Sequence, residues 1–219
     1  MFCVIIGVIV GGRLGYVLFY GEGYYFQHPE QILAFNKGGM SFHGGLIGAL
    51  LAGIAAAKLT RIPYLTLADL GCIGAPLGLL FGRCANFING ELWGAPTDAA
   101  WGVVFGGAAG TMPRHPSQLY EAFLEGVVIF AVLYLLSRRM PPRPRGTFLG
   151  TFLVMYGCFR FLVEFVREPD AQLGYLWGGW LTMGQLLSVP LILVGAGVLV
   201  YALVVKKPQK GLPEMKQSE

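Results

Sequence analysis

The stretch Phe81–Gly94, FGRCANFINGELWG, decides the fold of this chain, because it closes a long apolar run with a group of polar side chains. Between Arg83 and Glu91 it places one arginine, two asparagines and one glutamate. A charged side chain at the centre of a membrane-spanning helix costs about 2.5–3.5 kcal/mol on insertion scales. The chain therefore either leaves the membrane at this point or builds a polar pocket there.

The composition of the whole chain is that of an integral membrane protein. Of its 219 residues, 55% are hydrophobic and only 13% are charged, whereas soluble domains carry about 25% charged residues. The net charge of +4 bears first on membrane topology and second on contact with anionic lipid headgroups. The basic residues are scattered over loops and chain ends, which argues against a nucleic-acid partner. The four cysteines lie in apolar runs without CxxC spacing, so we interpret them as buried small hydrophobic residues.

Six apolar segments of about 20 residues predict an all-α polytopic membrane protein. We place the helices at Phe2–Tyr20, Phe42–Leu59, Leu67–Ile88, Leu119–Leu136, Phe148–Phe165 and Met183–Val205. We expect residues 1–205 to form a single integral membrane domain with outward-facing loops over a polar cavity. Residues 206–219 are expected to form a disordered cytoplasmic tail.

Basic residues in the short loops predict the orientation of these helices. Lys58 and Arg61 flank the second-to-third connection, arginines crowd residues 138–145, and Lys206 and Lys207 follow the sixth helix. With six crossings these three places lie on one side, which we assign to the cytoplasm together with Met1. The connections at residues 21–41, 89–118 and 167–182 then face outward.

Two glycine ladders at four-residue spacing predict close helix packing. Their members are Gly7, Gly11 and Gly15 in the first helix, and Gly74, Gly78 and Gly82 in the third. Small residues four apart let helix backbones approach closely in lipid, where packing drives association.

The unusual polar residues of five predicted helices lie toward the same outer leaflet. They are Arg13 and Tyr16, His43, the group from Arg83 to Glu91, the group from His115 to Glu121, and the pair Arg160 and Glu164. Arg160 and Glu164 are four residues apart and share one helix face. This convergence predicts a polar site near the outer membrane surface.

Each of these residues also has a purely structural interpretation. Arg160 and Glu164 fit an intrahelical ion pair, and His43 fits a hydrogen-bonded structural histidine. Arg83 fits an arginine that snorkels to the interface. Asn86 and Asn89 fit caps of a helix end.

The functional interpretation uses the residues in combination. Two arginines in an apolar bundle suit a phosphate or carboxylate ligand, and a histidine can act as a general base near neutral pH. Glu91 and Glu164 could orient the arginines or the base. There is no HExxH, GxSxG or metal–carboxylate motif, so we expect neither a metal nor a cofactor. The residues alone indicate a lipid-handling enzyme or an anion-binding transporter.

Several stretches, taken together, resemble the bacterial prolipoprotein diacylglyceryl transferases. The matching stretches are GGRLGYVLFY (Gly11–Tyr20), GGMSFHGGLIG (Gly38–Gly48), GRCANFINGELWG (Gly82–Gly94), RHPSQLYEAFLEG (Arg114–Gly126), YGCFRFLVEFVREPDAQLG (Tyr156–Gly174) and TMGQLLSVP (Thr182–Pro190). Each is weak alone, but their joint occurrence in this order over nearly the whole chain is specific.

The resemblance implies a membrane enzyme for the first step of bacterial lipoprotein maturation. Such an enzyme transfers the diacylglyceryl group of phosphatidylglycerol to the lipobox cysteine of a preprolipoprotein and releases glycerol phosphate. The resemblance also implies an inner-membrane location, with membrane lipids around the chain and the site toward the periplasm.

The resemblance also implies roles for individual residues. The candidate catalytic residues are His43 as the base for the thiol, Arg83 and Arg160 as phosphate ligands, and Glu164, which would set hydrogen-bond geometry. The candidate substrate-binding residues are Tyr16, Asn86, Asn89, Glu91, Gly94 and Tyr156. Gly94 would keep room near the headgroup, and the two tyrosines would contact lipid or donate hydrogen bonds.

The chain departs from the family pattern in three places, one of which is a loop at Ala95–Met112 that is shorter than in some relatives. Family members usually carry an N-terminal arm and one more membrane helix before the GGRLGY region, and Cys84-Ala85 replaces a bulky aliphatic–Gly pair. Two alternatives to the transferase remain. The residue chemistry also fits a transporter of an anionic lipid or metabolite, and the departure at the N-terminus fits a truncated, inactive membrane scaffold. A transporter would place its polar residues at the midplane of inverted repeats, which the one-sided distribution does not favour.

Overall fold

The computed structural model describes residues 2–19, 24–32, 38–138, 142–168, 176 and 181–209. The long elements in these ranges are all helices, and the β-structure described there consists of isolated bridges. The long helices are α1 (Phe2–Phe19), α3 (Phe42–Thr60), α4 (Tyr64–Asn89), α7 (Thr147–Val163) and α8 (Met183–Val205). A further helix is continuous through α5 (Ser117–Glu121), a π-helix (Ala122–Val128) and α6 (Ile129–Ser137). The short elements are α2 (Tyr24–Gln27) and the 3₁₀ turns Pro29–Gln31 and Gly107–Ala109.

The six helices expected from the sequence are confirmed to within a few residues at their ends. Four of them have the length and hydropathy of a membrane span: α1, α4, Ser117–Ser137 and α8. The helix α7 and the part Gly44–Thr60 of α3 are shorter apolar helices. The chain is an all-α polytopic membrane protein, and the number of six crossings stays a prediction.

The described helices group into two compact units, which are treated separately below. The first extends to Ala68 and the second covers Asp69–Gln209. The expectation of a single membrane domain over residues 1–205 stays a prediction.

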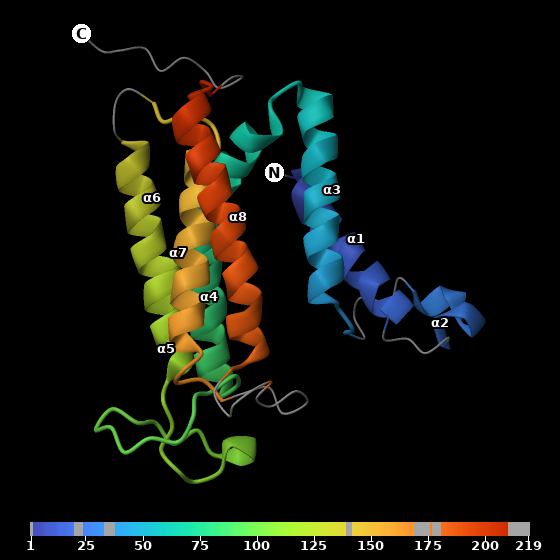
Figure 1. Cartoon of the computed structure of the whole chain (residues 1–219). Coiled ribbons are helices and arrows are strands. Elements are labelled where there is room, and N and C mark those ends of the chain that lie inside the picture. The colour runs from blue at the N-terminus through green and yellow to red at the C-terminus, as the bar shows by residue number, and fades with distance from the viewer. Residues whose placement is uncertain are drawn as a thin grey trace. The chain divides into compact units, whose positions relative to one another are not determined.

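In the first unit, α1 and α3 cross in close contact along the first glycine ladder (Figure 1). A Cβ atom added to Gly7 would lie 2.5 Å from the carbonyl oxygen of Gly48, and one added to Gly15 would lie 2.7 Å from the Cα atom of Gly44. The packing predicted for this ladder is therefore confirmed.

Arg13 stabilises the connection that follows α1 through hydrogen bonds to its backbone. Its guanidinium group donates to the carbonyl oxygens of Gln31 and Ile32, both at 2.7 Å, and of Gly38 at 2.6 Å. The side chain is almost completely buried, and its guanidinium carbon lies 5.2 Å from the ring centre of Tyr25. These backbone partners give Arg13 a structural task.

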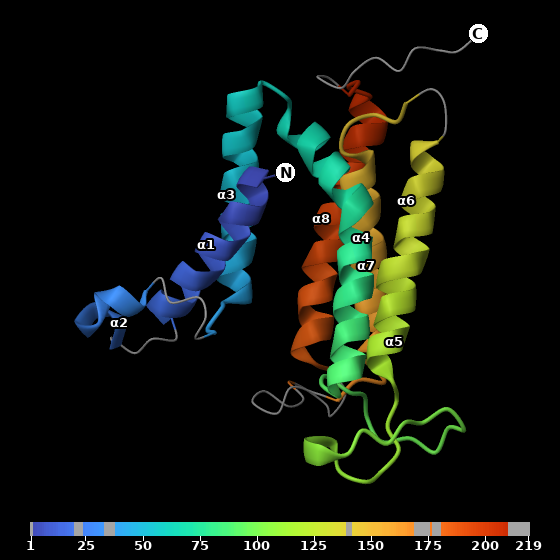
Figure 2. The same ribbon diagram turned by 180° about the vertical axis from the view of Figure 1, so that it is seen from behind.

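The second unit is a helix bundle in which α4, α6, α7 and α8 run side by side (Figure 2). Its apolar core is formed by Ile129, Leu133 and Phe148, with half-buried residues packed around them. The second glycine ladder does not contribute in the expected way, because a Cβ atom on Gly74 or Gly78 would meet no described atom within 4 Å. Close packing occurs instead at α7–α8, where a Cβ atom on Gly150 would lie 2.8 Å from the Leu199 nitrogen.

The cysteines are free thiols with different surroundings. Cys72 is buried, Cys84 and Cys158 are half-buried, and Cys3 is exposed. The expectation of burial is confirmed for Cys72 and is wrong for Cys3, which lies near the start of α1.

A buried arginine–glutamate cluster as candidate active site

The polar stretch that follows Phe81 ends α4 with a Schellman motif. Gly90 adopts the left-handed conformation with φ +65°. Its N–H donates to the Phe87 carbonyl at 3.1 Å, and the Glu91 N–H donates to the Asn86 carbonyl at 3.0 Å. These two bonds satisfy carbonyl groups that a helix end leaves without intrahelical donors. The chain thus leaves its helix here because glycine follows the last helical residue.

Asn86, Asn89 and Glu91 form a polar group at this helix end. The amide groups of Asn86 and Asn89 donate to Oε1 of Glu91 at 2.9 and 3.2 Å. These bonds, the stronger from Asn86, hold the pKa of the exposed Glu91 carboxyl below its ordinary value. Gln118 donates to the Glu91 carbonyl at 2.7 Å and ties the group to the start of α5. The asparagines therefore stabilise the helix end through Glu91, and their substrate-binding roles stay predictions.

Glu121, at the end of α5, is the centre of the ion-pair network. Arg83 Nε lies 2.5 Å from Oε2 of Glu121, Arg160 Nη1 lies 2.8 Å from Oε1, and Arg167 Nη1 lies 3.5 Å from Oε1. The Glu121 side chain is only 3% exposed. Three arginines from three separate segments thus meet one buried carboxylate.

Arg160 also joins Glu121 to a second carboxylate, Glu164. Its Nη2 atom lies 2.9 Å from Oε2 of Glu164, four residues further along the chain. The hydroxyl of Thr182 donates to the other oxygen of Glu164 at 2.9 Å. Thr182 is the N-cap of α8 and forms a capping box with Gln185. The intrahelical ion pair exists, and it is one part of a larger network.

The cluster is suited to an anionic ligand. Three guanidinium groups face the carboxylates of Glu121 and Glu164, which leaves one positive charge in excess among these five groups. In the described part of the chain, the ion pair of Arg83 uses Nε, and its two terminal nitrogens have no acceptor at hydrogen-bond distance. Terminal guanidinium N–H groups form a planar fork that matches two phosphate oxygens. The arrangement can therefore bind a phosphate in a mostly apolar bundle.

Gly94 positions the segment that carries Arg167. Its N–H donates to the His115 carbonyl at 2.9 Å, and it forms an isolated antiparallel bridge with Arg167. A Cβ atom on Gly94 would lie 2.6 Å from the carbonyl oxygens of both His115 and Val166. A side chain at this position would displace backbone, so the glycine has a structural task besides the predicted one of leaving room for a headgroup.

Tyr156 lies one turn before Arg160 on α7. Its ring stacks on Phe152 with the ring centres 5.8 Å apart, and the residue is half-buried. The position places its hydroxyl-bearing ring on the same helix face as Arg160. A role in lipid contact stays a prediction.

Two predicted site residues belong to the first unit. Tyr16 lies on α1, with its ring 5.8 Å from the Arg13 guanidinium and 6.4 Å from the ring of Tyr25. His43 is in the first turn of α3, after the N-cap Ser41, and its side chain lies outside the described residues. The structure thus joins Arg83, Arg160 and Glu164 in one network, and it describes Tyr16 separately.

Sequence reasoning placed Glu121 among the converging polar residues without giving it a role, and it missed Arg167 and Thr182 as members of the network. A signal for Glu121 existed, because Glu121 and Glu125 are two acidic residues four apart in an apolar segment. Such residues are costly in a membrane unless they are paired. Arg167 and Thr182 lie in connections, where sequence spacing does not indicate spatial neighbours.

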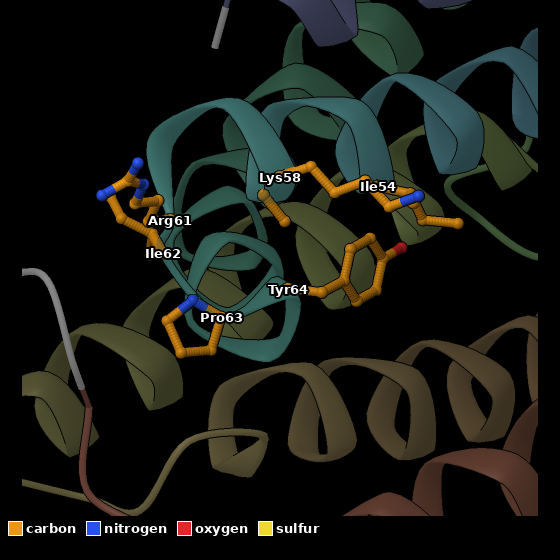
Figure 3. A pocket seen from close by; sticks show the side chains of 7 residues that line it. Ile54, Lys58, Arg61, Ile62, Pro63 and Tyr64 are labelled. Carbon is orange, nitrogen blue, oxygen red and sulfur yellow. The ribbon is translucent and has the colours of Figure 1, made fainter.

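A pocket of about 370 Å³ lies elsewhere, at the turn between α3 and α4 (Figure 3). It is lined by Ile54, Ala57, Lys58, Arg61, Ile62, Pro63 and Tyr64. Figure 3 shows the Arg61 side chain directed away from the Tyr64 ring. None of the predicted site residues lines this pocket, so we base the site on the ion-pair network.

Comparison with known proteins identifies the family of this chain. A family model described as prolipoprotein diacylglyceryl transferase matches residues 1–201. The phosphatidylglycerol–prolipoprotein diacylglyceryl transferase of Geobacter sulfurreducens is 54% identical over 211 residues, which cover 96% of this chain and 78% of the relative. The protein of the same name from Methylococcus capsulatus is 54% identical over 202 residues, covering 92% of this chain and 76% of the relative. Because the match extends over nearly the whole chain, this chain belongs to the prolipoprotein diacylglyceryl transferase family.

Proposed function

We propose that this diacylglyceryl transferase binds the phosphate of phosphatidylglycerol at the Glu121 cluster while it transfers the diacylglyceryl group to a prolipoprotein cysteine. In this reaction the cysteine sulfur forms a bond to the terminal glyceryl carbon of the diacylglyceryl group. The bond between that carbon and a phosphate oxygen breaks, and its electron pair leaves with glycerol phosphate. The thiol proton passes to a base.

The observation that carries this proposal is the convergence of Arg83, Arg160 and Arg167 on the single carboxylate of Glu121. The leaving group gains negative charge as the carbon–oxygen bond breaks. Guanidinium groups already fixed in place stabilise that charge without reorganising during the reaction. Glu121 and Glu164 hold the guanidinium groups of Arg83 and Arg160, so that their remaining N–H groups can bind phosphate oxygens.

His43 is the proposed base. Only the thiolate form of cysteine is a strong nucleophile, and a neutral imidazole can accept the thiol proton near neutral pH. Support for this assignment comes from the position of His43 in the stretch GGMSFHGGLIG, which is part of the family resemblance.

The proposed topology has six membrane crossings in the bacterial inner membrane, with the Arg83 end of α4 toward the periplasm. The basic loops around Lys58, Arg61 and Arg138 support this orientation through the positive-inside rule. It would place the cluster where a secreted prolipoprotein presents its cysteine.

The test uses the purified chain in detergent with phosphatidylglycerol and a peptide that carries a lipobox cysteine. Mass spectrometry should detect the diacylglyceryl thioether of the peptide. Arg83→Ala should abolish the product, whereas Arg138→Ala, which removes an exposed arginine after α6, should leave the rate unchanged. An active Arg83→Ala variant would refute the phosphate site, and a folded wild-type chain without product would refute the proposed activity.

The base assignment needs its own variant. His43→Gln keeps a polar side chain of similar size but cannot accept the thiol proton. The rate of thioether formation should fall at least tenfold, and the loss should be largest where most of the peptide is in the thiol form. Full activity of His43→Gln across neutral pH would remove His43 from the base role and leave the phosphate site untouched.

A further inference from the structure

Glu125 is a buried acidic residue that the proposed reaction does not use. It lies in the π-helix Ala122–Val128, four residues after Glu121, and its exposed fraction is 0%. Neither of its carboxyl oxygens has a hydrogen-bond donor among the residues that the structure describes. It therefore differs from Glu121 and Glu164, which are held by arginines.

The surroundings of Glu125 decide its charge. An ionised carboxylate without a hydrogen bond in a protein interior carries a large desolvation penalty, and such groups avoid it by taking up a proton. Arg83, Arg160 and Arg167 pair with Glu121, and Arg160 also pairs with Glu164; none of the arginines that the structure describes forms an ion pair with Glu125. Segments of π-helix are uncommon and occur frequently at functional sites.

The charged and titratable groups that act electrostatically on Glu125 come from its own helix, α4, α7 and the segment after α7. Besides Glu121 on its own helix, they are Arg83 on α4, Arg160 and Tyr156 on α7, and Arg167 after α7. All except Tyr156 belong to the network that binds Glu121. The protonation state of Glu125 therefore adjusts the charge of the proposed phosphate site.

We propose that Glu125 is held as a neutral carboxylic acid beside the cluster, which leaves the excess positive charge of the arginines available to the substrate. With Glu125 neutral, the cluster keeps one positive charge in excess, which matches the single negative charge of a phosphodiester. An ionised Glu125 would cancel this charge and compete with the substrate for a guanidinium group. This inference rests on the phosphate site proposed above.

Infrared spectroscopy of the purified chain tests the protonation state without any assay of activity. At neutral pH the wild-type spectrum should contain the carbonyl stretch of a protonated carboxylic acid, and Glu125→Gln should remove it. The matched control Glu30→Gln, at an exposed glutamate, should leave the band in place. Absence of the band in the wild type, or its persistence in Glu125→Gln, would overturn the proposal.

Kinetics then test how the charge at position 125 affects substrate binding. Glu125→Gln keeps a neutral side chain of the same size, so its KM for phosphatidylglycerol and its kcat should stay within about twofold of the wild-type values. Glu125→Lys adds a positive charge, and the KM for phosphatidylglycerol should change more than tenfold. A tenfold loss in Glu125→Gln would mean that an ionised Glu125 is required. An inactive wild type with the infrared band present would refute the proposed function but not the neutral state of Glu125.

Discussion

Glu164 lies so close to the first turn of α8 that a Cβ atom on Gly184 would be 2.6 Å from its carboxyl carbon. The helix α8 begins at Met183, so this carboxylate lies at the positive end of the helix dipole. It also accepts a hydrogen bond from the hydroxyl of Thr182 and pairs with Arg160. The start of α8 thus fixes the position of one arginine of the cluster.

Gly184→Ala should displace the Glu164 carboxylate and loosen Arg160. We expect kcat/KM to fall about tenfold, which corresponds to about 1.4 kcal/mol of transition-state stabilisation. Gly197→Ala on the same helix is the matched control, because a Cβ atom there would meet no described atom within 4 Å. Rates measured by mass spectrometry that were equal in the two variants would contradict this role for Gly184.

Glu121→Gln should have a stronger effect, because it removes the carboxylate shared by three arginines. Breaking a buried ion pair by removing one partner costs about 3–5 kcal/mol, and the side chain of Glu121 is 3% exposed. We expect a lower thermal unfolding temperature in detergent together with at least a hundredfold loss of thioether formation. Asp98→Asn, at an exposed position, should change neither. If Glu121→Gln kept wild-type activity, the ion-pair network would be unnecessary for the reaction.

The sequence predicted the helices well because membrane spans need long, uninterrupted apolar runs. The apolar segment Met183–Val205 coincides with α8 in the structure. The pairing of Arg160 with Glu164 was also predictable, because it depends only on helical spacing. Local patterns therefore gave the elements and the contacts within one element.

The pairing of Glu121 with three arginines could not be predicted, because it depends on contacts between elements. Arg83, Glu121 and Arg167 come from positions far apart in the sequence, and no local pattern indicates that they meet. The packing predicted for the second glycine ladder was wrong for the same reason. The spacing of Gly74 and Gly78 shows a helix face of small residues, but it does not show which element packs against that face. The structural task of Gly94 depends on the crossing of the backbone at His115 and Val166.

Gly94→Ala should disturb the ion-pair cluster, although Gly94 is not a member of it. The added methyl group would meet two carbonyl oxygens at 2.6 Å, and neither is the end of a flexible side chain. The segment at Val166 must therefore shift and carry Arg167 away from Glu121. We expect at least a tenfold fall in kcat/KM, about 1.4 kcal/mol, with Gly74→Ala as an unobstructed control. A normal rate for Gly94→Ala would show that this segment can adjust without moving Arg167.

The carboxyl of Glu91 should titrate at a pH below that of an ordinary glutamate, which has a pKa of about 4.3. Its pKa is lowered first by Asn86 and then by Asn89, so the stabilisation that these bonds provide is present above the ordinary pKa. It is lost as the pH falls through the lowered pKa of the folded state. NMR of the carbon-labelled carboxyl group should show this, and Asn86→Ala should move the titration back toward the ordinary value. A Glu91 titration unchanged by Asn86→Ala would contradict the hydrogen bond.

Asp69 should be a determinant of stability rather than of catalysis. The N-cap of α7 is Gly146, which has no side chain to cap the helix, and Asp69 on α4 supplies the missing acceptor. Its carboxylate accepts the N–H groups of Gly146 at 2.6 Å and Leu149 at 2.8 Å, and the side-chain amide of Gln209 at 2.7 Å.

Asp69→Ala leaves the start of α7 without these acceptors. Hydrogen bonds to charged groups contribute about 1.5–3 kcal/mol each. Losing the two bonds to backbone N–H groups of α7 should therefore cost at least about 3 kcal/mol, which corresponds to a fall of at least about 6 °C in the unfolding temperature for a chain of this size. Gln209→Ala removes one of the three donors and should cost less. Although α7 also carries Arg160, Asp69 does not belong to the ion-pair network, so the folded fraction of Asp69→Ala should keep its KM for phosphatidylglycerol. An altered KM at unchanged stability would mean that Asp69 acts on the site itself.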